Sequence, residues 1–304
     1  MPGPLVTIGI ATYNRAHIVT RAIDSVLSQD YAPLRLVIVD DGSTDETADV
    51  LERHASDPRV TVVVRASNGG VATAKNTLLD HMLGIYGGIV DSDDSLFPGA
   101  ISQCVKAFEE LGEGVSQILT CCVDEAGAPT GHGLTASGFV SYEAALSDRF
   151  GGEFWQMFRI QDLGRRRFHP DAVTSETLVW HAMLREKPMY FLNVVTRRYN
   201  LRGADRISID RRRDKKLVYG RMMAYKVYLD EFGEDLKRIA PARYAEVSLE
   251  LAKWEARLGD RRKALRTLAR ARRSQPPKFG LALAVVLMPR ALREAAYWWR
   301  DRRR

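Results

Sequence analysis

Two clusters of aspartates each follow a short apolar run within the first hundred residues of this 304-residue chain. The apolar runs are residues 36–39 (LVIV) and 85–90 (IYGGIV), and the clusters that follow them are residues 40–41 (DD) and 91–94 (DSDD). Short runs rich in β-branched residues predict buried strands, so each cluster is expected at the carboxyl end of a strand. In an open α/β sheet, that edge is where ligands bind.

The carboxylates within each cluster would repel one another unless a cation joined them. Mg²⁺ and Mn²⁺ prefer carboxylate oxygens and usually share them with a substrate phosphate. The clusters therefore predict a metal–nucleotide site. The alternative is a pair of acidic turns, because Asp-Gly and Asp-Asp are common in loops. Two clusters after two strands favour the site.

Strand and helix patterns alternate along the first part of the chain. Strands are expected at residues 6–11, 34–39, 60–64 and 85–90, and helices at residues 20–27, 43–54, 71–83 and 100–111. This alternation predicts a parallel sheet with helices on both faces. Residues 115–215 are less regular, and from about Lys215 the chain is expected to be helical. Residues 241–258 and 261–273 resemble one tetratricopeptide-like hairpin, which is too few for a repeat array.

The charge of the chain is uneven. From Lys253 onward it carries 16 Lys/Arg and 4 Asp/Glu, a net charge of +12, whereas residues 1–252 have a net charge of −5. This asymmetry predicts an anionic partner, either a membrane or a nucleic acid. The apolar run 279–288 is followed by Trp and Arg residues, which favours an interfacial membrane anchor. A C-terminal helix packed on the core is the alternative; no nucleic-acid partner is expected, because no recognition module accompanies the charge.

The expected location is the cytoplasm, peripheral on the inner face of the cell membrane. The first residues (MPGP) lead into a strand pattern without a charged leader, and no apolar run reaches the length of a transmembrane helix. The three cysteines form no CxxC pair, which favours a reducing compartment and no zinc site.

Four motifs occur in an order that strongly resembles family 2 glycosyltransferases of the GT-A fold. They are residues 11–15 (ATYNR), 39–45 (VDDGSTD), 68–76 (NGGVATAKN) and 91–94 (DSDD). The resemblance is tight over residues 4–110 and loose over 111–210. It implies an α/β fold with a Rossmann-like mixed sheet flanked by helices. It also implies an inverting transfer of one sugar from a nucleoside diphosphate sugar, a UDP-sugar here, with Mn²⁺ or Mg²⁺.

The resemblance places several residues beside the nucleotide. Thr12, Tyr13 and Arg15 would offer a ring to the base and a cation to the phosphates, although Tyr13 could instead pack in the core. Asp40 would accept the imide N–H of uracil, with a neutral capping role for Asp41 or Ser43 as the alternative. Residue 75 is often Arg in the family; Lys75 keeps the charge but loses the bidentate fork. A solvated helix face is the alternative for Lys75.

The remaining assignments concern the metal, the general base of the reaction and a loop. Asp93 is expected to bind the metal, and Asp91 the metal or the ribose. Inversion needs a general base on the acceptor side. Glu176 is the candidate, where the family often has Glu-Asp, with Asp171 in reserve. The alternative for Glu176 is a partner of the helix dipole.

Arg202 and Arg206 lie where the family has a mobile loop. They could close on the diphosphate and exclude water, or belong to a plain solvated loop.

The predicted organisation has three parts. Residues 1–214 form a GT-A catalytic domain, residues 215–275 a helical extension, and residues 276–304 a basic amphipathic tail. The expected reaction adds a sugar to a hydroxyl of a lipid-linked or cell-surface polysaccharide precursor. One rival is a sugar-nucleotide nucleotidyltransferase, which usually has a Gly-rich loop that residues 12–15 lack. The other rival is a non-catalytic membrane-bound scaffold, which the intact acidic motifs disfavour.

Overall fold

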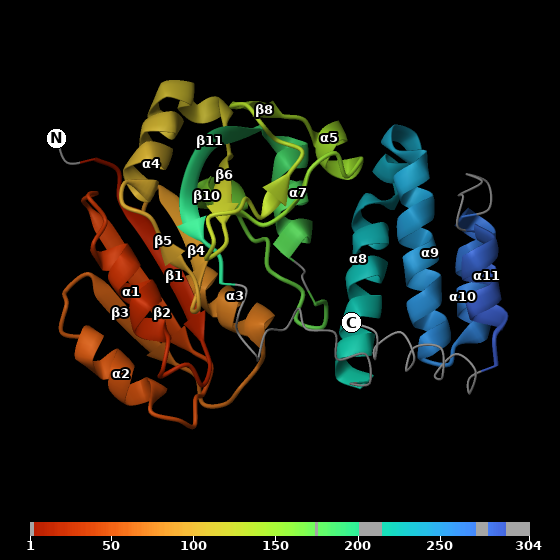
Figure 1. Ribbon diagram of the computed structural model, residues 1–304, viewed down its shortest axis with the longest axis horizontal. Coiled ribbons are helices and arrows are strands. Elements are labelled where there is room, and N and C mark those ends of the chain that lie inside the picture. Colours follow the sequence, from red (N-terminus) through yellow and green to blue (C-terminus); the bar gives the residue numbers. More distant parts are fainter. Residues whose placement is uncertain (1–2, 174–175, 201–214, 272–278, 290–304) are drawn as a thin grey trace. The chain divides into compact units, whose positions relative to one another are not determined.

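The computed structural model describes residues 3–173, 176–200, 215–271 and 279–289. The chain divides into two compact units. The first consists of Met1–Pro170 and Val179–Ile207, and the second of Asp171–Leu178 and Ser208–Arg304. In Figure 1 the first unit is a sheet flanked by helices and the second is helical. The predicted boundary at residue 214 lies outside the described residues.

The first unit is built on a mixed sheet. Its strands are β1 (Val6–Thr12), β2 (Leu34–Asp40), β3 (Val60–Val64), β4 (Tyr86–Asp91), β5 (Ser95–Leu96), β6 (Gln117–Val123), β8 (Gly138–Val140), β10 (Phe154–Arg159) and β11 (Met189–Arg198). The order is β3-β2-β1-β4-β10-β6-β11-β5, with β8 paired to β11. The first four strands in this order are parallel, as the alternation predicted, but β10 runs antiparallel to both neighbours. A separate two-stranded ladder joins β7 (Gly131–His132) to β9 (Gly151–Gly152).

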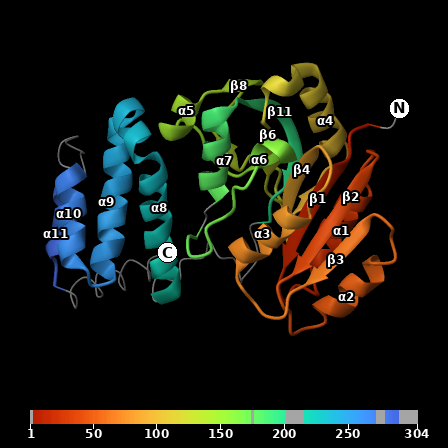
Figure 2. The same ribbon diagram turned by 180° about the vertical axis from the view of Figure 1, so that it is seen from behind.

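Helices cover both faces of this sheet (Figures 1 and 2). They are α1 (Val19–Leu27), α2 (Thr47–His54), α3 (Val71–His81), α4 (Ala100–Leu111), η1 (Gly112–Gly114), α5 (Tyr142–Leu146), α6 (Ile160–Leu163) and α7 (Glu176–Glu186). Successive side chains of β2 go to opposite faces. Leu36 and Ile38 join the core with α1 and α4, whereas Val37 and Val39 join the core with α3. Burial on both faces explains why the strand is a continuous apolar run.

A buried arginine at the end of β10 closes the carboxyl end of α4. The Nε of Arg159 donates to the carbonyl of Val115 at 2.9 Å, and its Nη2 to that of Gly112 at 2.7 Å. The guanidinium also lies 5.2 and 5.1 Å from the ring centroids of Tyr86 and Phe108, which are stacked on each other. A charged donor thus satisfies carbonyls that a helix end leaves without partners.

We predict that Arg159→Met lowers the free energy of unfolding by about 2–4 kcal/mol, because buried carbonyls lose their donors. Urea denaturation followed by circular dichroism measures this change. The control is Arg149→Met, which removes an exposed arginine paired with Glu143 and should cost less than about 0.5 kcal/mol. Equal losses in the two variants would show that Arg159 does not hold this helix end.

The second unit is made of four described helices. They are α8 (Lys215–Ile239), α9 (Pro241–Arg257), α10 (Arg261–Ala271) and α11 (Phe279–Leu287). The contact between α9 and α10 is made largely by small residues, with Ala252 and Ala256 facing Ala264 and Leu268. Helices α9 and α10 occupy the range, residues 241–273, over which the sequence predicts a tetratricopeptide-like hairpin.

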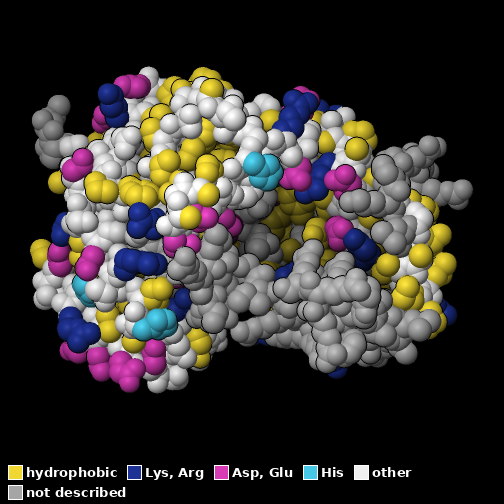
Figure 3. Space-filling model, viewed as in Figure 1, with side chains coloured by type: hydrophobic (Ala, Val, Ile, Leu, Met, Phe, Trp, Pro, Cys, Tyr) yellow, Lys and Arg dark blue, Asp and Glu magenta, His cyan; other side chains and the backbone are white. Residues whose placement is uncertain are grey.

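The described surface of the first unit carries both signs of charge. Figure 3 shows basic and acidic side chains interspersed over this face, with acidic ones gathered at the edge where α2 lies. Within the described ranges, the helices are all too short or too polar to cross a bilayer.

Candidate functional site

Three adjacent strands bring the predicted donor-site residues to one edge of the sheet. The register sets Thr12 of β1 beside Asp40 of β2, and Ala11 of β1 beside Asp91 of β4. All three strands are parallel, so both acidic clusters lie at the carboxyl edge, as the sequence predicted. In an open α/β sheet, this edge is the usual place for a ligand.

The two aspartates after β2 have different partners. Asp40 is buried and accepts hydrogen bonds from the backbone N–H of Ser43, at 3.0 Å, and from its hydroxyl. Asp41 accepts from the backbone N–H groups of Gly69 and Gly70, at 3.1 and 2.8 Å, and pairs with Arg65. Asp41 therefore anchors the glycine-rich loop that opens α3, and Asp40 orients its own turn.

The segment after β1 presents an aromatic ring and a cation. Tyr13 exposes 40% of its surface, so the alternative of core packing is wrong. Thr12 is buried at the strand end. The backbone N–H of Arg15 donates to the hydroxyl of Thr47 at 2.9 Å, and its guanidinium lies 3.4 Å from Asp93. This contact joins the first motif of the sequence to the fourth.

We call Asp91, Asp93 and Asp94 the acidic turn. Each of its carboxylates pairs with a cation from a different part of the first unit. The pairs are Asp91 with Lys75 at 2.7 Å, Asp93 with Arg15 at 3.4 Å and Asp94 with Arg197 at 3.2 Å. Lys75 is buried, so its alternative as a solvated side chain on α3 is wrong. The mutual repulsion of three carboxylates is offset by these cations.

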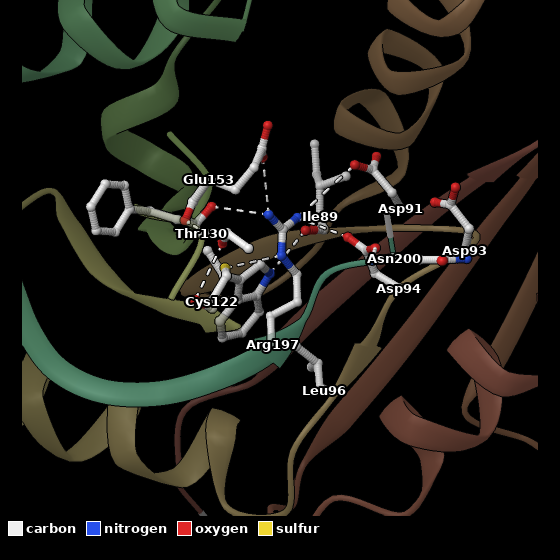
Figure 4. A network of polar contacts seen from close by, with 12 residues as sticks. Ile89, Asp91, Asp93, Asp94, Leu96, Cys122, Thr130, Glu153, Arg197 and Asn200 are labelled. Carbon is white, nitrogen blue, oxygen red and sulfur yellow. Dashed lines mark hydrogen bonds and ion pairs between the residues drawn. The ribbon is translucent and has the colours of Figure 1, made fainter. Parts of the chain in front are cut away.

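Arg197 of β11 lies at the centre of this network (Figure 4). Its guanidinium is buried and reaches Asp94, Asp91 at 4.0 Å and Glu153 at 3.3 Å. Its Nε also donates to the sulfur of Cys122 at 3.2 Å. Arg197 was not among the site residues predicted from the sequence. The available signal was a pair of arginines at the end of a strand, of which only one can face the solvent.

The aspartates of the acidic turn differ in their ionisation. Burial disfavours charge on Asp91, but Lys75 and Arg197 outweigh it and hold the pKa of Asp91 below its ordinary value. Burial raises the pKa of Asp94 to about 7, although Arg197 opposes the shift. Asp91 therefore stays charged at neutral pH, whereas Asp94 is a buried group that also accepts from the backbone N–H of Asn200 at 2.9 Å.

The two half-buried members of the acidic turn fit a divalent cation. The side chains of Asp91 and Asp93 are 40% and 16% exposed, whereas Asp94 is buried. Mg²⁺ is commonly held by one or two carboxylates, with phosphate oxygens and water completing its shell. No group of three or more His, Cys, Asp or Glu side chains within the described part of the chain could hold a metal alone. A metal held by Asp91 and Asp93 would therefore also need oxygens from phosphate and water.

The two candidates for the general base, Glu176 and Asp171, belong to the second unit. Helix α7 begins at Glu176, which stands in its first turn, and Asp171 precedes the helix in the chain. Arg202 and Arg206, which the sequence placed in a mobile loop, lie outside the described residues.

We predict that Arg197→Met lowers the free energy of unfolding by about 3 kcal/mol, because it leaves buried Asp94 and nearby Glu153 without their cation. It should also weaken UDP binding by moving Asp91. Guanidinium denaturation and calorimetric titration with UDP measure the two effects. The control is Arg198→Met, since Arg198 is exposed on the same strand and packs over Phe97. If both variants bind UDP like the native chain, Arg197 has no part in the donor site.

The matches between this chain and known proteins cover the same motifs. A family model described as Glycosyl transferase family 2 matches residues 7–169. GalNAc(5)-diNAcBac-PP-undecaprenol beta-1,3-glucosyltransferase of Campylobacter jejuni is 26% identical over 274 residues, which is 86% of each chain. Chondroitin synthase of Pasteurella multocida is 42% identical over 106 residues. That match covers 34% of this chain and only 11% of the synthase.

Two solved structures share the fold. S. aureus TarS 1-349 in complex with UDP-GlcNAc has a TM-score of 0.68 at 16% identity, covering 98% of this chain and 92% of TarS. The mannosyltransferase PcManGT from Pyrobaculum calidifontis, in complex with GDP-Man and Mn²⁺, has a TM-score of 0.57 at 21% identity. The match covers 93% of this chain and 79% of the PcManGT chain. These likenesses confirm the GT-A fold class predicted from the sequence.

Proposed function

The chain belongs to glycosyl transferase family 2 and is a glycosyltransferase; we propose that it moves one sugar, with inversion, from a UDP-sugar to a hydroxyl of a lipid-linked or cell-surface polysaccharide precursor. The observation that carries this proposal is the acidic turn at the end of β4, in register with Asp40 at the end of β2. The family match disfavours the nucleotidyltransferase, and the intact acidic motifs disfavour the scaffold.

The donor side is assigned to the first unit. Buried Asp40 would accept the imide N–H of uracil, and the exposed ring of Tyr13 would stack beside the base. Arg15 and Lys75 would supply positive charge near the diphosphate. A UDP-sugar is supported by the fold shared with TarS, which binds UDP-GlcNAc.

The residues of the acidic turn would hold Mn²⁺ or Mg²⁺, with Asp93 as the principal ligand and Asp91 beside it. A bound ion would supply neutralisation of the diphosphate as it leaves. A Mn²⁺ requirement is supported by the fold shared with PcManGT, which was solved with that ion.

Glu176 would remove the proton of the acceptor hydroxyl, with Asp171 as the reserve base. A carboxylate suits this step because a general base must be ionised at the operating pH. Arg202 and Arg206 would close on the diphosphate and exclude water.

The acceptor side connects the chain to a membrane. The Campylobacter jejuni relative acts on an undecaprenol-linked substrate, as its name states. With the net charge of +12 from Lys253 onward, this supports a peripheral location on the inner face of the cell membrane. The tail, residues 276–304, would contact anionic lipids.

A thermal-shift series with UDP, GDP, dTDP and CMP, each with Mn²⁺, tests the donor assignment. A ligand that binds the native state raises its apparent stability by mass action. UDP should give the largest shift, and Mn²⁺ should increase it. A larger shift with GDP would move the donor class to GDP-sugars.

We predict that Asp93→Ala abolishes transfer and the Mn²⁺-dependent part of UDP binding while leaving the fold intact. The reason is that Asp93 supplies a metal ligand at an exposed strand end. Release of UDP from UDP-sugars and calorimetric titration measure both effects. Asp49→Ala, on the exposed side of α2, is the matched control and should behave like the native chain. Mn²⁺-dependent UDP binding that survives in Asp93→Ala would remove Asp93 from the metal role.

We predict that Glu176→Gln lowers the transfer rate by roughly 10²–10⁴-fold, the usual contribution of a general base. Donor binding should stay near native, because the base acts on the acceptor. The rate is measured beside Asp171→Asn and beside Glu186→Gln, which changes an exposed glutamate at the other end of α7. A fully active Glu176→Gln with an inactive Asp171→Asn would move the assignment to Asp171.

A further inference from the structure

Helix α10 carries a row of three exposed arginines. Arg262, Arg266 and Arg270 follow one another at every fourth residue, so they form one stripe, which we call the basic ridge. The opposite side of α10 is buried through Ala264, Leu268 and Ala271. Figures 1 and 2 show α9 with α8 on one side and α10 and α11 on the other.

The basic ridge is unfavourable for the helix that carries it. Like charges four residues apart on a helix repel one another. The first turn of α10 also holds Arg261, Arg262 and Lys263. Asp260, directly before the helix, accepts from the backbone N–H of Lys263 at 3.0 Å and supplies the anion that the helix dipole favours there, so the unbalanced charge is that of the ridge. Among the described residues, no ion pair is formed by the ridge arginines.

Other basic residues of the same unit are arranged differently. Lys226, Lys237 and Arg243 are each paired with an acidic residue three or four positions away on their own helix. On α8 and α9, these basic residues have an acidic partner on their own helix, whereas the ridge arginines of α10 do not. Such a departure from the local pattern indicates a functional surface on α10. The charge of that surface calls for an anionic partner.

An apolar helix packs against α10, the helix that carries the ridge. The residues of α11, Phe279–Leu287, carry no charge, and Leu287 is 56% exposed. Arg261 of α10 donates to the backbone carbonyls of Leu287, at 3.4 Å, and Met288. Leu265, which is 40% exposed, stands one turn after Arg261 on α10. Arginines and exposed leucines therefore share one end of this surface.

We infer that α10 and α11 form a docking surface for an anionic lipid bilayer. The ridge arginines bind lipid phosphates, while Leu265 and Leu287 enter the interfacial layer; arginine side chains suit this arrangement because their stems are apolar and their heads charged. A second copy of the chain fits less well, since two like ridges repel. A nucleic acid would leave the leucines without a partner. The inference rests on the proposed lipid-linked acceptor. It extends the proposed lipid contact from the tail, in which α11 lies, to the folded helix α10.

Co-sedimentation of the full chain with vesicles tests this surface. Phosphatidylcholine vesicles with and without phosphatidylglycerol are compared for the native chain and for Arg262→Gln/Arg266→Gln/Arg270→Gln. Each basic residue near an anionic surface contributes roughly fivefold, so the triple variant should lose about 100-fold in binding to the anionic vesicles. The control Lys226→Gln/Lys237→Gln/Arg243→Gln removes the same charge from paired positions and should change binding less than about threefold. Thermal melting checks that both variants fold.

A second variant tests the contribution of the two exposed leucines to vesicle binding. Leu265→Gln/Leu287→Gln should lose the fraction of binding that persists at high salt, because that fraction depends on apolar contact rather than charge. Unchanged high-salt binding in this variant would overturn the role of the leucines.

Three further results would overturn the inference. The ridge variant could bind like the native chain while a chain ending at residue 289 does not bind, which would assign the membrane contact to residues 290–304 alone. The native chain could bind duplex RNA but no vesicles. Light scattering could show an oligomer that the ridge variant separates. UDP binding, measured without vesicles, reports on the proposed function independently of all these results.

Discussion

A buried guanidinium in the first unit makes it possible to place three carboxylates within four residues. Arg197 reaches two members of the acidic turn and Glu153 from inside the sheet. In the strand order, β10 and β6 separate β4 from β11, but β5 follows the acidic turn directly and pairs with the end of β11. The ion pairs and the β5–β11 ladder therefore fasten the same turn from two directions. Without a buried cation, the aspartates would repel one another in a poorly solvated place.

The aspartates of the acidic turn differ in role according to their burial. Asp94 is enclosed, shares Arg197 and accepts a backbone hydrogen bond, so its contribution is to the shape of the turn. Asp91 and Asp93 face the solvent more openly and are balanced by Lys75 and Arg15. In the proposed reaction, these two cations would also balance the charge of the diphosphate. The same aspartate-rich motif thus supplies both rigidity and a place for charge.

Local patterns made much of this architecture predictable. The strands that end in Asp40 and Asp91 follow from β-branched runs, and the parallel part of the sheet follows from their alternation with helices. The antiparallel β10 did not follow from that alternation; the mixed sheet was implied only by the resemblance to the family. Arg197 was missed because its main partner, Asp94, is about one hundred residues away in the chain, and no local period marks such a pair. Whether Tyr13 and Lys75 are buried could be decided only in three dimensions.

The anchoring of the glycine-rich loop by Asp41 has a consequence for the electrostatics of the site. Gly70 precedes α3 with a φ of 86°, a conformation that a side chain would strain, and its N–H is held by Asp41. Five residues later, the same helix delivers the ammonium group of Lys75 to Asp91. The end of β2 thereby sets the position of a cation at the end of β4. The two strand ends are therefore coupled through α3: a displacement of the loop held by Asp41 would move Lys75 and change the charge balance beside Asp91.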